Sequence, residues 1–190
     1  MKVLLLGDSH FVRKEGKNKP HIEWSLEVIH PSWTFQNVSI SGATSGCLLK
    51  QLRKIELQSY DVVFVMVGSN DLATNQQISL PEFEENVKEI LTYLNQACLV
   101  EKICLISPPP VDQDKQFYRT NRLVQSYEQR LRQIALEFGS DFISLVEVFE
   151  SSQLPIEVLL EGSLDDGLHF GFQGYALLAQ AMVDTVQSKK

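Results

Sequence analysis

Residues 2–11 read KVLLLGDSHF, an aliphatic run that stops abruptly at glycine, aspartate, serine and histidine. A continuous apolar run of this kind is typical of a strand that is buried on both faces of a sheet. Taken alone, Gly7-Asp8-Ser9 has the composition of an ordinary turn or helix cap. Whether Ser9 is a turn residue or a nucleophile therefore depends on the other polar segments of the chain.

Four further apolar runs predict strands. They lie at residues 34–40, 61–67, 102–107 and 141–148, and the run at 61–67, DVVFVMV, is the most strongly apolar. Strands without a polar face are typical of parallel sheets that are covered on both sides. The pattern therefore predicts five parallel strands, beginning with KVLLL.

Helical patterns alternate with these strands. Apolar residues recur at helical spacing over 83–94, behind the start signal at Ser79, over 124–138, before Gly139, and over 172–186. Strands that alternate with helices predict an α/β fold, joined by right-handed crossovers. We therefore expect a three-layer α/β/α sandwich around a central five-stranded parallel sheet.

Length and cysteine content indicate the kind of protein. The 190 residues are expected to form one domain over 1–190. The three cysteines, Cys47, Cys98 and Cys104, are odd in number, lack a CxxC spacing and lie in or beside apolar segments. We interpret them as reduced thiols, which favours a reducing compartment. The sequence does not indicate an oligomeric state.

Charge and hydropathy exclude two classes of partner. The net charge is −7, and the basic cluster of Arg13, Lys14, Lys17 and Lys19 is short and lacks interleaved aromatic residues, so we expect no nucleic-acid partner. The first apolar run is too short for a signal peptide or a membrane span. We expect a cytoplasmic protein that begins at Met1, although a secreted origin with a signal peptide already removed stays open.

Polar or glycine-rich groups follow three of the predicted strands and precede the last helix. They are Gly7-Asp8-Ser9, the segment SGATSG at 41–46, Gly68-Ser69-Asn70-Asp71, and the pair Asp166 and His169. Each group has a structural interpretation when it is taken alone. The carboxyl ends of parallel strands meet at one edge of the sheet, where α/β proteins bind their ligands. The sequence therefore predicts that all four groups converge on one site.

Together the four groups resemble the sequence blocks of the SGNH hydrolases, also called GDSL esterases or lipases. The resemblance extends over residues 3–188 and implies the flavodoxin-like, SGNH-hydrolase type of α/β fold. One departure is His10, which follows the serine where many relatives carry leucine or another apolar residue. This departure leaves the chemistry intact and makes His10 a question about the substrate.

The resemblance implies a role for each group. Ser9 is the expected nucleophile, His169 its base, and Asp166 the carboxylate that orients the imidazole, with Asp165 as a competitor one position away. The expected oxyanion donors are the backbone N–H groups of Ser9 and Gly42 and the side-chain amide of Asn70. Asp8 and Asp71 are expected to support these groups by bonding to loop backbone.

The predicted activity is that of a serine esterase or acylhydrolase, which cleaves short acyl or acetyl esters through an acyl-enzyme on Ser9 without a cofactor. The partner would be a small-molecule, carbohydrate or lipid ester. A thioesterase and a carbohydrate acetylesterase are alternatives within the family. A non-catalytic ligand-binding or scaffold domain with the same fold is an alternative of another kind.

The remaining histidines have no spacing typical of metal ligands, so no metal site is predicted. We expect His21 and His30 at a helix surface or cap, whereas His10 either contacts the substrate or lies at the surface. The apolar residues of 150–165 predict a short helix that ends at Gly162 and either packs on the core or covers an acyl pocket.

Overall fold

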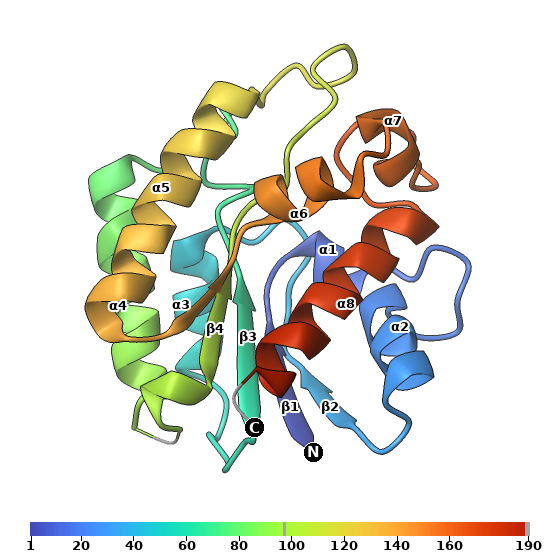
Figure 1. Ribbon diagram of the computed structural model, residues 1–190. Helices are drawn as coiled ribbons and strands as arrows, with labels where there is room; N and C mark the ends of the chain where they lie inside the picture. Colours follow the sequence, from blue (N-terminus) through green and yellow to red (C-terminus); the bar gives the residue numbers. More distant parts are fainter. Residues whose placement is uncertain (97, 189–190) are drawn as a thin grey trace.

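A five-stranded parallel sheet forms the centre of the computed structural model, which describes residues 1–96 and 98–188. Every neighbouring pair of strands is parallel, with the order β2-β1-β3-β4-β5. This arrangement confirms the predicted sheet (Figure 1). The strands are β1 (Lys2–Leu6), β2 (Thr34–Asn37), β3 (Val62–Met66), β4 (Ile103–Ile106) and β5 (Asp141–Ile143).

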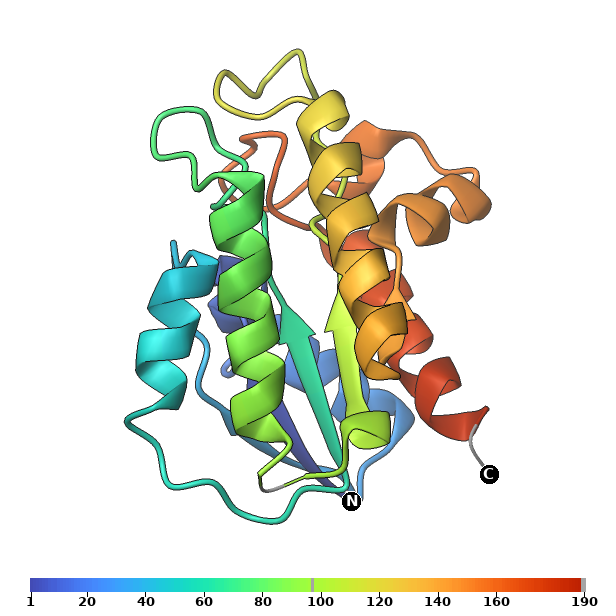
Figure 2. The ribbon, with the colours of Figure 1, turned by 90° about the vertical axis from the view of Figure 1, so that its left-hand side faces the viewer.

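Helices cover both faces of the sheet and complete the three predicted layers (Figure 1). Figure 2 shows α3, α4 and α5 lying over one face, and α2, α6, α7 and α8 pack on the core at the other. No described helix is long and apolar enough to cross a membrane. The helices are α1 (Ser9–Val12), α2 (His21–Ile29), α3 (Ser45–Leu52), α4 (Leu80–Leu94), the 3₁₀ turn η1 (Val100–Lys102), α5 (Asn121–Phe138), α6 (Leu145–Ser152), α7 (Ile156–Leu159) and α8 (Phe172–Gln187).

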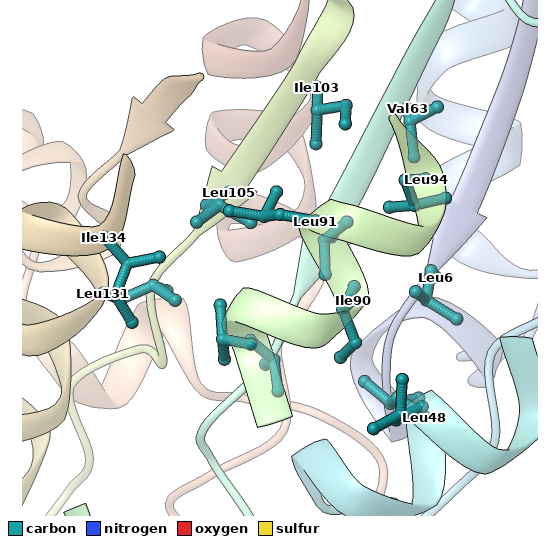
Figure 3. Packing of buried hydrophobic residues seen from close by; sticks show 14 of the residues in the cluster. Leu6, Leu48, Val63, Ile90, Leu91, Leu94, Ile103, Leu105, Leu131 and Ile134 are labelled. Atoms are coloured by element: carbon teal, nitrogen blue, oxygen red, sulfur yellow. The ribbon is translucent and has the colours of Figure 1, made fainter. Parts of the chain in front are cut away.

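Burial on both faces explains why β3, β4 and the part of β1 beyond Lys2 are apolar, whereas the partly exposed strand β2 carries polar residues. Successive side chains of a strand point to opposite faces. Leu4 and Leu6 therefore pack with the α3, α4 and α5 side, whereas Val3 and Leu5 pack with the other side. All four are fully buried. Figure 3 shows the first of these layers, where Ile90 of α4 lies among leucines, isoleucines and valines of the sheet and helices.

The start of α4 and the end of α5 lie where the sequence predicts. The Ser79 hydroxyl accepts a hydrogen bond from the backbone N–H of Glu82 at the start of α4. Gly139 ends α5 in the left-handed conformation, with φ of 73°, which glycine adopts without steric cost. Local signals thus set these boundaries.

Two predicted strands are too long. The fifth strand ends at Ile143 instead of residue 148, because the Ser144 hydroxyl accepts a hydrogen bond from the backbone N–H of Glu147 at 3.1 Å and starts α6. Serine and glutamate three residues apart are typical of a helix start, and this local signal prevails over the apolar composition. The second strand ends at Asn37 instead of residue 40.

Ile90 is fully buried between α4 and the sheet, whereas Leu136 of α5 is 85% exposed. Ile90→Ala should lower the free energy of unfolding by about 2–5 kcal/mol, because it leaves a cavity in a packed layer. Leu136→Ala, the control, should change it by less than about 0.5 kcal/mol. Urea denaturation of the two variants measures this difference, and equal losses would contradict the packing described here.

Candidate active site

Ser9 lies directly beyond the carboxyl end of β1. Asp8 caps the short helix α1, since its Oδ1 accepts a hydrogen bond from the backbone N–H of His10 at 3.0 Å. Ser9 is the first residue of α1 and is 8% exposed. The first amides of a helix have no partner within it. Among the described residues, none accepts a hydrogen bond from the backbone N–H of Ser9.

Asp166, His169 and Ser9 form one continuous chain of hydrogen bonds. Asp166 Oδ1 accepts from the backbone N–H groups of Leu168 and His169, at 3.0 and 3.1 Å, which fixes the carboxylate against its own loop. Its Oδ2 lies 2.7 Å from His169 Nδ1, and His169 Nε2 lies 2.8 Å from Ser9 Oγ. A proton on Nδ1, bonded to Asp166, leaves the Nε2 lone pair free to accept the serine proton.

The electrostatic surroundings keep the His169 imidazole in its neutral form. Burial lowers the pKa of His169 below 6.5, and so do the nearby charges of His10 and Arg13, whereas the bond to Asp166 opposes this effect without cancelling it. Burial opposes the charge of Asp166, but the hydrogen bonds from His169 and from the backbone of Leu168 lower the pKa of that carboxyl overall. The pair is therefore arranged as an ionised carboxylate beside a neutral base.

Asp165, the competitor for Asp166, points elsewhere. Its side chain is 72% exposed and forms an ion pair with Lys115 on the loop after β4. The structure brings Asp166, and not Asp165, into contact with His169.

The turn at Gly42 lies beside the Ser9 loop, because the backbone N–H of Ile40 donates to the carbonyl of Gly7 at 3.0 Å. Gly42 has a φ of 75°, a conformation that L side chains rarely adopt, which accounts for glycine at this position. Within the part of the chain that the structure describes, its backbone N–H has no acceptor.

Asn70 joins the other two loops. Its Nδ2 donates to the carbonyl of Ala43 at 3.0 Å and to Asp8 Oδ2 at 3.2 Å. The side-chain amide predicted as an oxyanion donor therefore lies between the Gly42 turn and the Ser9 loop. A ligand oxygen would have to replace or share the longer bond, which is the one to Asp8.

Two residues of the loop after β4 belong to this site and were not predicted from the sequence. Arg119 donates to the carbonyl of Ser69 at 2.8 Å and to Asn70 Oδ1 at 3.2 Å, so that it orients the amide with Nδ2 toward the site. Gln116 donates to the backbone carbonyl of Asp166. The position of this loop beyond the carboxyl end of a strand was a signal, but the loop contains no motif that singles out either residue.

Asp8 and Asp71 both accept hydrogen bonds from backbone N–H groups at the start of a helix. Asp71 is fully buried and accepts from the backbone N–H of Ser45 at 2.9 Å and from its hydroxyl. Burial raises the pKa of Asp71 to about 6, although the bonds from Ser45 act in the opposite direction. Asp71 thereby fixes the start of α3, directly after the Gly42 turn.

The surface or cap position expected for His21 is wrong, and of the two alternatives for His10 the surface one is wrong. His10 is fully buried and bonded at both ring nitrogens, because Asp8 and the segment 168–170 enclose it. His21 is 2% exposed and stacks on Tyr175, since α2 packs against α8 at this point. His30 is the C-terminal cap of α2, as expected.

The apolar segment 150–165 packs on the core. Its helix α7 ends at Leu159 and not at Gly162, and Leu159 and Leu160 are buried. Gly162 lies against the backbone of the His169 loop, where an added Cβ would come within 2.7 Å of the His169 carbonyl oxygen. This segment therefore supports the loop that carries His169.

Among residues 1–96 and 98–188, no three His, Cys, Asp or Glu side chains are grouped so that they could hold a metal ion. The site consists of a serine, an imidazole and a carboxylate in sequence, with amide donors beside the serine. This arrangement can activate a hydroxyl and stabilise negative charge on an oxygen.

The family model of the GDSL-like Lipase/Acylhydrolase family matches residues 5–177. Among curated proteins, the chain is 26% identical over 162 residues to the isoamyl acetate-hydrolyzing esterase of Saccharomyces cerevisiae, a match that covers 77% of the chain and 66% of that protein. It is 27% identical over 143 residues to the human isoamyl acetate-hydrolyzing esterase 1 homolog, covering 67% and 56%. The chain thus matches only about half to two thirds of the length of these relatives.

Solved structures share the fold. A lipase/acylhydrolase from Enterococcus faecalis superimposes with a TM-score of 0.86 and 22% identity, covering 99% of this chain and 96% of that one. An acetylxylan esterase from Geobacillus stearothermophilus superimposes with a TM-score of 0.75 and 21% identity, covering 97% and 93%.

The raised pKa of Asp71 makes stability depend on pH. Folded Asp71, with a pKa of about 6, binds its proton more tightly than the unfolded chain, whose value is near 3.8. This contribution to stability is present at low pH and is lost as the pH rises through about 6. Asp71→Asn removes it, so the variant should gain roughly 3 kcal/mol relative to wild type between about pH 4 and 7.

Urea denaturation of both proteins across this pH range measures the gain. Asp114→Asn, at an exposed loop position, is the control and should differ from wild type by a constant amount. A constant difference for Asp71→Asn as well would contradict the protonation of Asp71 in the folded protein.

Proposed function

The chain belongs to the GDSL-like lipase/acylhydrolase family, and we propose that it is a serine esterase that removes short acyl groups from small esters through an acyl-enzyme on Ser9. The observation that carries the proposal is the unbroken chain of hydrogen bonds from Asp166 through His169 to Ser9, at 2.7 and 2.8 Å. A serine hydroxyl is a weak nucleophile unless a base of this kind accepts its proton.

In the first half of the reaction, Ser9 Oγ forms a bond to the ester carbonyl carbon while His169 Nε2 accepts the hydroxyl proton. Asp166 stabilises the imidazolium that results and keeps the ring in place. When the tetrahedral intermediate collapses, the bond to the alcohol oxygen breaks and His169 returns the proton to that oxygen. The alcohol leaves, and the acyl group stays on Ser9.

In the second half, water replaces the alcohol. His169 accepts a proton from the water as its oxygen attacks the acyl carbon, and then gives the proton back to Ser9 Oγ as the acid is released. The negative oxygen of both intermediates would be bound by the backbone N–H groups of Ser9 and Gly42 and by Asn70 Nδ2. Three such donors, prepositioned by the backbone and by Arg119, would stabilise charge only as it develops.

The names of the relatives favour acetyl esters. The yeast protein is named for the hydrolysis of isoamyl acetate, and a structural neighbour is named an acetylxylan esterase. We therefore propose an acetyl ester as the preferred substrate and a small organic alcohol as the leaving group. Comparison of acetyl, butyryl and octanoyl aryl esters, together with acetylated xylose and an acetyl thioester, tests this choice, and a faster reaction with the longer chains would contradict it.

A fluorophosphonate probe, which reacts with activated serines, separates an esterase from a binding domain of the same fold. The wild-type protein should be labelled at Ser9, and Ser9→Ala should lose both the label and turnover of an aryl acetate, by about 10⁴-fold or more in kcat. Ser41→Ala, at an exposed serine of the neighbouring turn, is the control and should keep both. A folded wild-type protein that is never labelled at Ser9 would exclude the proposed mechanism.

The Asn70 amide should act mainly on the transition state. Asn70→Ala should lower kcat by about 10²–10³-fold and leave KM within about threefold, because an oxyanion donor bonds most strongly to the charged intermediate. Asn86→Ala is the matched control, since this amide donates at 3.1 Å to Ser45 in the adjacent network and does not contact the Ser9 loop. Steady-state kinetics measure kcat and KM separately, and a variant that raises KM but keeps kcat would exclude this role.

A further inference from the structure

His10 is enclosed between the two loops that carry the serine and the catalytic histidine. Its ring is fully buried, with Nδ1 at 2.8 Å from Asp8 Oδ1 and Nε2 at 3.2 Å from the backbone carbonyl oxygen of Leu168. A carboxylate and a carbonyl can only accept hydrogen bonds. Beside an ionised Asp8, a neutral ring would direct a lone pair at one of these oxygens, so the geometry favours a proton on both ring nitrogens.

Three more contacts hold His10 in place, two through its backbone and one through its ring. The backbone N–H of His10 also donates to Asp8, at 3.0 Å, and its backbone carbonyl accepts from the Tyr175 hydroxyl of α8 at 2.9 Å. The rings of His10 and His169 are stacked, with centroids 5.3 Å apart and planes inclined by 29°. His10 therefore touches the nucleophile loop, the base and the helix that follows it.

We propose that His10 is a positioning residue, a buried imidazolium that neutralises Asp8 and fixes the Leu168–His169 backbone against the Ser9 loop. The proposal rests on the proposed esterase function for its catalytic consequence. His10 would form a charged link between the two loops, and it would not contact the substrate.

Neutralising Asp8 matters because of where this carboxylate lies. It is bonded to Asn70 Nδ2 at 3.2 Å and directly precedes Ser9. An unpaired carboxylate there would repel the oxyanion that Asn70 is proposed to bind. Burial by itself would raise the pKa of Asp8, but the charge and hydrogen bonds of His10 outweigh burial and lower it, which favours the ionised carboxylate.

The charge of His10 also acts on the base. A cation stacked on His169 disfavours a second positive charge on that ring, in the same direction as burial. Neutral His169 is the form that accepts the Ser9 proton, so His10 would extend the active range toward lower pH. The other charged or titratable groups around the two rings are Asp8, Asp166, Arg13, Arg119 and Tyr175.

Nitrogen-15 NMR of histidine side chains tests the charge state without any substrate. In the wild-type protein at pH 7, His10 should show two protonated ring nitrogens and His169 one, with the signals assigned from variants. His21 is the internal comparison, because it is equally buried but neither ring nitrogen has a partner among the described residues. A single protonated nitrogen on His10 at pH 7 would overturn the proposal.

The pH profile of kcat/KM with an aryl acetate tests the effect on catalysis. At low pH, kcat/KM falls because His169 becomes protonated, and the midpoint of this acid limb should lie below pH 6.5 in the wild-type protein. His10→Leu and His10→Gln both remove the cation, and each should move the limb to higher pH, by about 0.5 to 2 pH units for unit charges at this separation. His10→Gln should keep more of kcat than His10→Leu, since its amide can still donate to Asp8. His21→Gln should leave the limb in place.

These outcomes separate this proposal from the proposed function. If wild-type protein hydrolyses the ester but His10→Gln keeps the wild-type acid limb, the role of His10 is excluded and the esterase stands. If wild-type protein is inactive, the same comparison is made by NMR titration of His169 in wild type and in His10→Gln. An unchanged pKa of His169 would then exclude the role of His10 as well.

Discussion

Parallel pairing of β1 with both of its neighbours is the constraint on which the site depends. Val3 pairs with Phe35 of β2 and with Val62 of β3, so the three strands run side by side in one direction and end at the same edge. The loops that follow them are therefore neighbours in space, although they lie 30 to 60 residues apart in the chain. Burial of β1 and β3 on both faces makes this edge rigid.

Hydrogen bonds within each loop fix its catalytic side chain relative to the backbone of that loop. Asp8 caps the helix that begins at Ser9, and Asp166 bonds to the backbone of the segment that carries His169. Short-range hydrogen bonds of this kind fix a side chain relative to its own loop. Long-range bonds then join the loops: Ser9 to His169, Asn70 to Ala43 and Asp8, and Asp71 to Ser45. Because each side chain is already fixed within its loop, the bonds between loops only have to position the loops relative to one another.

The three carboxylates of this site have different partners, and these partners shift their pKa values differently. Asp8 is paired with His10, Asp166 with His169, and Asp71 lies among hydrogen-bond donors in a buried position where its pKa is about 6. Removing the charge of one carboxylate would change the pKa of the others, because charges in a buried site are poorly screened by water. The arrangement therefore couples stability, pH dependence and the proposed chemistry.

The sequence by itself determined the layers of the fold, the long helices with their caps, and the edge of the sheet at which polar groups gather, because periodicity and capping are short-range properties. It also carried the resemblance that the family match confirms. Only the tertiary structure decided that Arg119 orients Asn70 and that His10 is buried rather than exposed. The first depends on a contact between residues 49 positions apart, Arg119 and Asn70, and the second on one between residues 158 apart, His10 and Leu168, and no local pattern in the chain encodes either.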